Sequence, residues 1–252
     1  MKIMSYNVLC RDWRERSDAV TALVKQQQPD TFGLQEAHYD WIKVFCRALP
    51  QYSYVGVGRD DGDKKGEFSP VFYLTDKFAL VDSGSFWLNE TQDSPYLGWD
   101  AACIRICSYA LLRSLETQEL FAHFNTHLDH VGFNAQVMGA RLVAAKIKEL
   151  YPDTNTVLTG DFNVEPQSEP YMELINNGLL DTRQMAKRTS SRGTYQAFDK
   201  IDTSSGRSTI DYIFTDCKTA SVESFEVLRP HREGELPASD HDPVCAILHF
   251  DK

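Results

Sequence analysis

The segment LTGDFNVEP, residues 158–166, ends an apolar run with the polar pattern on which we base the fold prediction. A glycine turns the chain, and Asp161 and Asn163 follow it before Pro166 interrupts the backbone. Gly, Asp, Asn and Pro are common loop residues, so this pattern alone is also typical of an ordinary turn. A functional interpretation therefore needs the same pattern at other strand ends.

Other apolar segments do carry a polar residue at or near one end. They are SYNV with Asn7, LQEA with Glu36, NTHL with His127, TIDYIF with Asp211, and SDHDPV with Asp240 and His241. Each has an ordinary alternative, such as a helix cap for Glu36 or a salt bridge for Asp211. An unpaired buried carboxylate is costly, so a whole series of such residues at strand ends favours an active site.

Short runs of β-branched and aromatic residues alternate with a few helical patterns, which predicts a mixed α/β protein. We expect strands at residues 2–8, 31–34, 52–57, 71–74, 79–87, 102–112, 120–125, 156–159, 209–214, 221–227 and 244–250, and helices at residues 14–27, 39–49, 133–150 and 170–177. Residues 182–207 are polar and are expected to form a surface loop. Without repeats or linkers, we expect one domain over residues 1–252.

The acidic composition restricts the partners. Lys and Arg number 26 against 36 Asp and Glu, a formal net charge of −10 that repels long polyanions. A phosphate-containing ligand can still bind where a metal or a few cations reverse the local sign. We see neither a secretory signal nor an apolar run long enough for a membrane span, so we expect a cytoplasmic protein that does not bind membranes. Nothing in the sequence demands a partner subunit, so we expect a monomer.

The candidate site residues also predict a cofactor. Oxygen ligands without a cysteine select a hard divalent cation, so we expect Mg²⁺, with Mn²⁺ as the alternative. Because Mg²⁺ keeps several waters, Glu36 with Asn7 and Asp240 would be a sufficient set of protein ligands.

The ordered series SYN, LQE, NTHLDH, GDFN, IDYIF and SDHDPV, between residues 5 and 244, resembles the endonuclease/exonuclease/phosphatase superfamily. The resemblance implies a four-layered α/β/β/α sandwich of two mainly antiparallel sheets flanked by helices, as in deoxyribonuclease I. It also implies the following residue roles: metal binding by Glu36, Asn7 and Asp240, catalysis by Asp161, Asn163, His241, Asp211 and His127, and phosphate contact by Arg105, His127 and Asn163.

These residues and the resemblance predict Mg²⁺-dependent hydrolysis of a phosphoester by in-line attack of water. Asp161 and His241 are both candidates for the general base. Tyr96 and Trp99, in a loop with Pro95 and Gly98, are candidates for stacking on a ring of the substrate.

The substrate prediction has three alternatives. We place a phosphodiesterase or nuclease-type enzyme first. The alternative is a phosphomonoesterase acting on a small sugar, inositol or nucleotide phosphate, which the acidic charge suits better than a long polymer. A binding module that keeps the fold without catalysis is the third.

Overall fold

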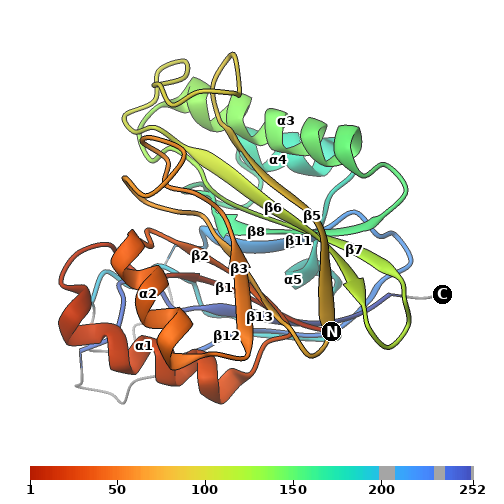
Figure 1. Ribbon diagram of the computed structural model, residues 1–252. Helices are drawn as coiled ribbons and strands as arrows, with labels where there is room; N and C mark the ends of the chain where they lie inside the picture. The colour runs from red at the N-terminus through yellow and green to blue at the C-terminus, as the bar shows by residue number, and fades with distance from the viewer. Residues whose placement is uncertain (199–207, 230–235, 251–252) are drawn as a thin grey trace.

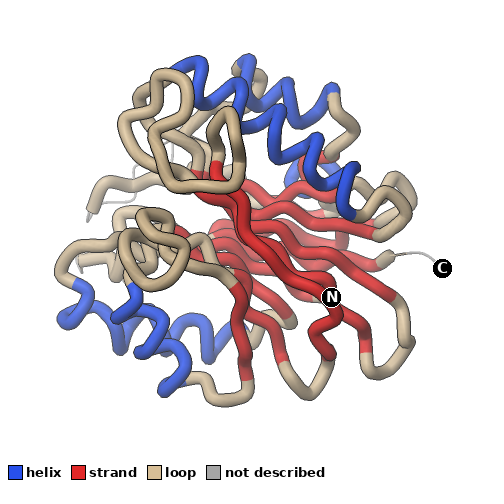
Figure 2. The backbone as a smooth tube through the Cα atoms, turned by 45° about the horizontal axis from the view of Figure 1, so that its top comes forward, coloured by secondary structure: helices blue, strands red, loops and turns tan. Residues whose placement is uncertain are grey.

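The computed structural model describes residues 1–198, 208–229 and 236–250 of the protein. In these residues, two β-sheets pack face to face and helices cover their outer faces, as Figures 1 and 2 show. This arrangement confirms the predicted α/β sandwich.

The first sheet combines the N-terminal strands with strands from the end of the chain. In spatial order they are β10 (Arg188–Thr189), β12 (Ser221–Val227), β13 (Val244–His249), β1 (Lys2–Asn7), β2 (Thr31–Gln35), β4 (Val71–Leu74) and β3 (Tyr52–Val55). The pairs β1–β2 and β10–β12 are parallel and the other pairs are antiparallel.

The second sheet is built from the middle of the chain. In spatial order its strands are β5 (Phe78–Trp87), β6 (Ile106–Ser114), β7 (Leu120–His127), β8 (Asn155–Asp161), β11 (Asp211–Thr215) and β9 (Leu180–Asp181). Only the pair β7–β8 is parallel among the described strands of this sheet. Both sheets are therefore mainly antiparallel, as the family resemblance implies.

Helices bury the outer face of each sheet. Helices α1 (Trp13–Gln27) and α2 (Tyr39–Ala48) lie outside the first sheet, and α3 (Phe133–Leu150) and α4 (Glu169–Asn176) lie outside the second. Apolar side chains fill both helix–sheet interfaces, around Phe32 and Trp41 in one and Phe124 and Phe162 in the other. In the described chain, no helix combines the length and apolarity that crossing a membrane requires.

A seam of buried polar side chains joins the two sheets. Gln35 Nε2 donates a hydrogen bond to Asn125 Oδ1 at 2.7 Å, and the two ring nitrogens of His123 lie 2.7 and 2.8 Å from the hydroxyls of Thr31 and Thr159. Gly33 makes this close approach possible, because a Cβ atom there would lie 2.2 Å from Asn125 Oδ1. The inner faces are therefore held by specific hydrogen bonds as well as by apolar packing.

Two predictions about the secondary structure are wrong in part. Strand β6 begins at Ile106 instead of residue 102, because the backbone N–H groups of Ala102 and Cys103 donate to Asp129 Oδ2. The expected loop at residues 182–207 contains helix α5 (Thr182–Met185) and strand β10, and its residues 199–207 lie outside the described structure. Helix α5 is capped by Asp181 and fixed by the Thr182 hydroxyl, which donates to Ile213 O, a contact that a local sequence pattern does not reveal.

Candidate active site

Parallel pairing brings the strand-end residues to one edge of the sandwich. Strands β1 and β2 place Asn7 beside Gln35, with Glu36 next in the chain, and β7 and β8 place His127 beside Asp161. The carboxyl ends of parallel strands meet at the same sheet edge, so these side chains converge from both sheets.

Antiparallel strands bring further residues to the same edge. Asp211 begins β11 and pairs in register with Asp161 at the end of β8. Strand β13 runs antiparallel to β1, so His241, shortly before β13, lies beyond the end of β1. Residues far apart in the sequence thus meet because their strands alternate in direction.

A cleft of about 390 Å³ opens where these residues meet. It is lined by Glu36, Arg59, Glu67, Cys103, Arg105, His127, His130, Asp161, Asn163, Tyr195, Ile210, Asp240 and His241. Asn7 and Asp211 are buried behind this lining and contact it through hydrogen bonds. Among the described residues, Tyr96 and Trp99 do not line this cleft. The Tyr96 hydroxyl instead accepts a hydrogen bond from Thr91 N within its own loop, and the predicted stacking role of both residues remains a prediction.

Asp161 is held at the centre by two asparagines. Its Oδ1 accepts from the backbone N–H of Asn163 at 2.9 Å, and its Oδ2 accepts from Asn7 Nδ2 at 3.0 Å. Burial raises the pKa of Asp161, although nearby His241 opposes the rise. The carboxylate is therefore fixed in orientation and more basic than a solvated aspartate.

His241 lies between two carboxylates. Its Nδ1 is 2.9 Å from Asp211 Oδ2, and its Nε2 is 3.6 Å from Asp161 Oδ2. Burial alone would lower the pKa of His241, but Asp211 and Asp161 outweigh it and raise the pKa. Asp161, Asp211 and His241 also bring three potential metal-ligand atoms within 4.8 Å of one another.

Glu36 occupies a strained position directly after β2. Its φ of 59° lies in the left-handed region, which is uncommon for a residue of this type and typical of functional sites. Asn7 Nδ2 donates to its Oε1, and Cys10 N–H donates to its Oε2, both at 3.0 Å. Burial raises the pKa of Glu36, but these hydrogen bonds more than offset that effect and the pKa is lowered.

The oxygen-rich side of the cleft suits a divalent cation. Burial, followed by repulsion from Glu36, raises the pKa of Asp240, and His241 only partly offsets this rise. A cation between Glu36 and Asp240 would relieve that repulsion, and its oxygen ligands would match the preferences of Mg²⁺ and Mn²⁺. Asn7 turns its amide nitrogen toward the carboxylates, while its Oδ1 accepts from Leu9 N.

Two arginines form a cationic wall of the cleft. Arg105 was predicted on a strand but lies just before β6, where it is buried and its Nη1 is 4.0 Å from Glu67 Oε2. Arg59 Nη1 donates to the same oxygen at 2.6 Å. His127 Nδ1 is 3.9 Å from Glu67 Oε2, and burial keeps the pKa of His127 well below its ordinary value.

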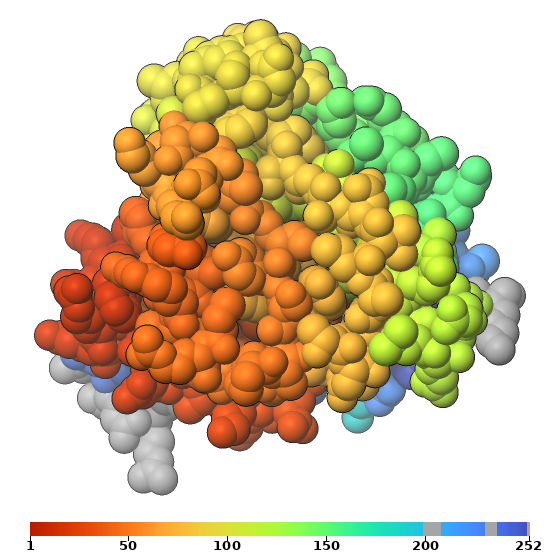
Figure 3. Space-filling view, in the orientation of Figure 1, coloured from red at the N-terminus to blue at the C-terminus, as the bar shows by residue number. Residues whose placement is uncertain are grey.

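The sequence interpretation did not identify Arg59, Glu67 or Tyr195 as site residues. Arg59 and Glu67 belong to the polar loop before β4. Trp87, the last residue of β5, donates through Nε1 to Arg59 O at 2.6 Å. This loop therefore lies beside the loop that follows β5, on the face shown in Figure 3. Glu67 directly precedes the apolar run FSPVFY, which is the same signal that marked the other strand-associated residues. Tyr195 carries no such signal, and its ring centroid lies 5.0 Å from that of His241.

Comparison with known proteins gives a consistent result. The profile of the Endonuclease/Exonuclease/phosphatase family matches residues 4–241. A solved structure of Bacteroides thetaiotaomicron mannosyl-6-phosphatase Bt3783 is 38% identical, with a TM-score of 0.92, and the match covers 99% of this chain and 100% of that one.

More distant relatives match over most of this chain. Protein angel of Drosophila melanogaster is 25% identical over 210 residues, which are 72% of this chain and 57% of that protein. The probable RNA exonuclease NGL3 of Saccharomyces cerevisiae is 26% identical over 210 residues, which are 71% of this chain and 41% of that protein. The chain thus spans about half the length of these two relatives.

Proposed function

Because the chain belongs to the endonuclease/exonuclease/phosphatase family, we propose that it is a metal-dependent hydrolase of phosphoester bonds. The observation that carries this proposal is the cleft that Asp161 and His241 line together with the carboxylates of Glu36 and Asp240. A general base, a hydrogen-bond donor and an oxygen-ligand site lie together there, as the in-line attack of water on phosphorus requires.

Glu36 and Asp240 would hold the cation, which we propose to be Mg²⁺. When bound, it would supply positive charge that stabilises the phosphate oxygens. Asn7 orients Glu36 and Asp161 through its amide nitrogen, and its predicted role as a metal ligand remains a prediction.

The general base of the proposal is Asp161. A fixed and desolvated carboxylate can accept the proton of the attacking water, and Asn163 and Asn7 hold it in place. His241 has its Nδ1 turned to Asp211, so its Nε2 is directed toward the cleft side of Asp161 and can donate to a phosphoryl oxygen. This geometry favours Asp161 over His241 as the base.

The cationic wall would bind the phosphate. Arg105 and Arg59 place guanidinium groups on the cleft, and Asn163 Nδ2 donates to His127 Nε2 at 3.0 Å. Positive charge and hydrogen-bond donors at this wall would stabilise the negative charge that grows on the phosphoryl group in the transition state.

For the substrate, we propose a small phosphorylated molecule carrying a phosphomonoester, such as a sugar phosphate. The cleft volume of about 390 Å³ and the net charge of −10 support a small ligand, and the 38% identical relative is named a mannosyl-6-phosphatase. The phosphodiesterase or nuclease predicted first remains the second candidate, supported by the relative named as a probable RNA exonuclease. The cytoplasmic location and the monomeric state stay predictions.

Initial hydrolysis rates test the proposal. We would compare p-nitrophenyl phosphate, bis(p-nitrophenyl) phosphate and mannose 6-phosphate, with Mg²⁺, Mn²⁺ or a chelator, for the native chain and Asp161→Asn. Asp93→Asn, at an exposed site, is the matched control. Metal-dependent turnover that Asp161→Asn lowers by about 10²-fold or more supports the assignment. Turnover by Asp161→Asn at the native rate would contradict it, and the preferred ester would decide between the two candidates.

A further inference from the structure

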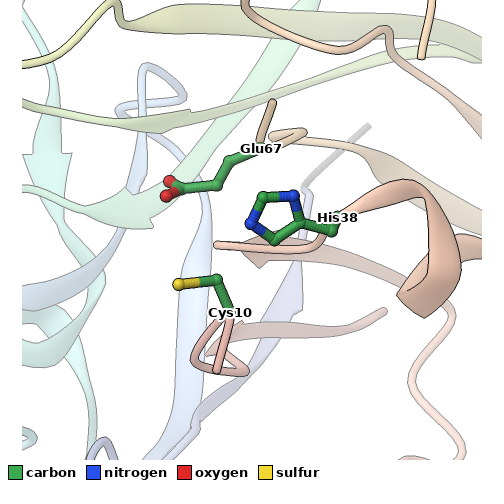
Figure 4. Close-up of side chains that lie close together, drawn as sticks. All are labelled: Cys10, His38 and Glu67. Carbon is green, nitrogen blue, oxygen red and sulfur yellow. The ribbon is translucent and has the colours of Figure 1, made fainter. Parts of the chain in front are cut away.

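We propose that Cys10, His38 and Glu67 form a second metal site, which takes a zinc-like ion of borderline softness. The three side chains come from separate segments: the turn after β1, the residue before α2 and the loop before β4. Figure 4 shows that they point toward a common space, and their ligand atoms lie within 4.8 Å of one another. A single ion can therefore contact all three after small side-chain adjustments.

The donor set differs in kind from that of the proposed Mg²⁺ site. A thiolate, an imidazole and a carboxylate are the ligands of Zn²⁺ and related transition metals, whereas Mg²⁺ takes oxygen almost exclusively. Three protein ligands leave one position of a tetrahedral ion for water. The two sites should therefore select different ions from a mixture.

Each of the three residues has a side-chain atom that can coordinate an ion. His38 precedes α2 but makes no side-chain cap to the helix, so its ring is not engaged there. Cys10 forms no disulfide, its thiol lies in hydrogen-bonding contact with Glu36, and all three residues are only partly buried. Glu67 holds Arg59 through Oε2, and a carboxylate has a second oxygen with which to bind an ion. On coordination, the thiol proton leaves to solvent as the sulfur–metal bond forms.

The proposed site shares a wall with the catalytic cleft. Cys10 N–H donates to Glu36 Oε2, and Glu67 is the partner of Arg59 in the cleft lining. An ion bound by Glu67 would compete with Arg59 for the negative charge of the Glu67 carboxylate. Occupancy of this site is thereby coupled to the cationic wall, although binding itself does not depend on the proposed hydrolase activity.

Co²⁺ absorption gives a direct test, since a thiolate ligand produces a charge-transfer band in the near ultraviolet. We would treat the full-length protein with chelator and reductant, add excess Mg²⁺ to occupy oxygen-only sites, and titrate with Co²⁺. The expected result is a thiolate band that saturates at about one equivalent and disappears when Zn²⁺ displaces Co²⁺.

Variants assign the band to its ligands. Cys10→Ser should abolish it, and His38→Gln should weaken Co²⁺ binding about 10-fold or more. Cys103→Ser is the matched control, because Cys103 lies on the same cleft in another group of possible ligands, with Asp129 and His130. Thermal unfolding would verify that each variant is folded, and His38→Gln tests the site even if Cys10→Ser does not fold. Absence of the band in the native chain, or its persistence in Cys10→Ser, would overturn the proposal.

Discussion

Asp211 Oδ2 lies 2.9 Å from His241 Nδ1, and neither residue is appreciably exposed to solvent. Because Asp211 pairs in register with Asp161, the imidazole lies between the two carboxylates at the end of the sheet. Asp211 thus fixes which nitrogen of His241 is directed away from the cleft.

Asp211→Asn tests this positioning role. The amide keeps the shape of the side chain but removes the charge that holds the imidazolium, so we expect kcat to fall about 10²-fold with KM nearly unchanged. The measurement is steady-state kinetics on the preferred ester. Asp216→Asn is the control, since Asp216 accepts a hydrogen bond from Thr156 N at the opposite end of β8. A loss of thermal stability without a selective fall in kcat would indicate a structural role only.

Arg105→Lys tests the phosphate wall. Lysine keeps the charge but cannot reproduce the planar fork with which arginine approaches a phosphate, so kcat/KM should fall about 10- to 100-fold, mainly through KM. Arg113→Lys, on the exposed part of β6, provides the control and should behave as the native chain. Native kinetics for Arg105→Lys would remove Arg105 from the phosphate site.

The strand-end residues could be predicted because the signal is local. Asp161 and Asp211 each interrupt an apolar run, and such an interruption is visible without knowledge of the partner strand. Their distances could not be predicted, because those depend on the register between β8 and β11. The ordered motifs supplied this arrangement through family resemblance, and the family and the sandwich fold are confirmed.

Long-range contacts explain what the sequence interpretation missed. Arg59 enters the cleft because its loop packs against Trp87 and is paired with Glu67, and neither contact follows from spacing. Arg105 was assigned to a strand because its neighbours are apolar. The backbone N–H groups of Ala102 and Cys103, which precede it, instead donate to Asp129 Oδ2 and are not available for strand pairing. Tertiary hydrogen bonds override local propensity in both loops.

Gly33→Ala tests the close approach of the two sheets. The added Cβ would lie 2.2 Å from Asn125 Oδ1 and 2.4 Å from Thr159 Oγ1, so the polar seam must separate. We expect the free energy of unfolding to fall by about 2–4 kcal/mol, measured by urea denaturation. Gly139→Ala in α3 is the control, because its Cβ would meet only flexible leucine side chains and alanine favours a helix. Equal stabilities for the two variants would contradict this account.

His123 should make stability depend on pH. Thr31 Oγ1 donates to Phe72 O, so His123 Nδ1 donates to Thr31, and His123 Nε2 lies 2.8 Å from the hydroxyl of Thr159. The ring is completely buried, which disfavours its charged form and lowers the pKa of His123 from 6.5 to about 3.

Below pH 6.5 His123 is protonated in the unfolded chain. In the folded chain His123 stays neutral until the pH approaches its lowered pKa of about 3. The contribution to stability is therefore complete above pH 6.5 and falls as the pH decreases, by about 2 kcal/mol at pH 5. Urea denaturation at pH 7 and pH 5 would measure it. His123→Asn should lower the stability at both values but flatten the difference, whereas His249→Asn, at an exposed histidine, should keep the native difference. An unchanged difference in His123→Asn would show that other groups cause the pH dependence.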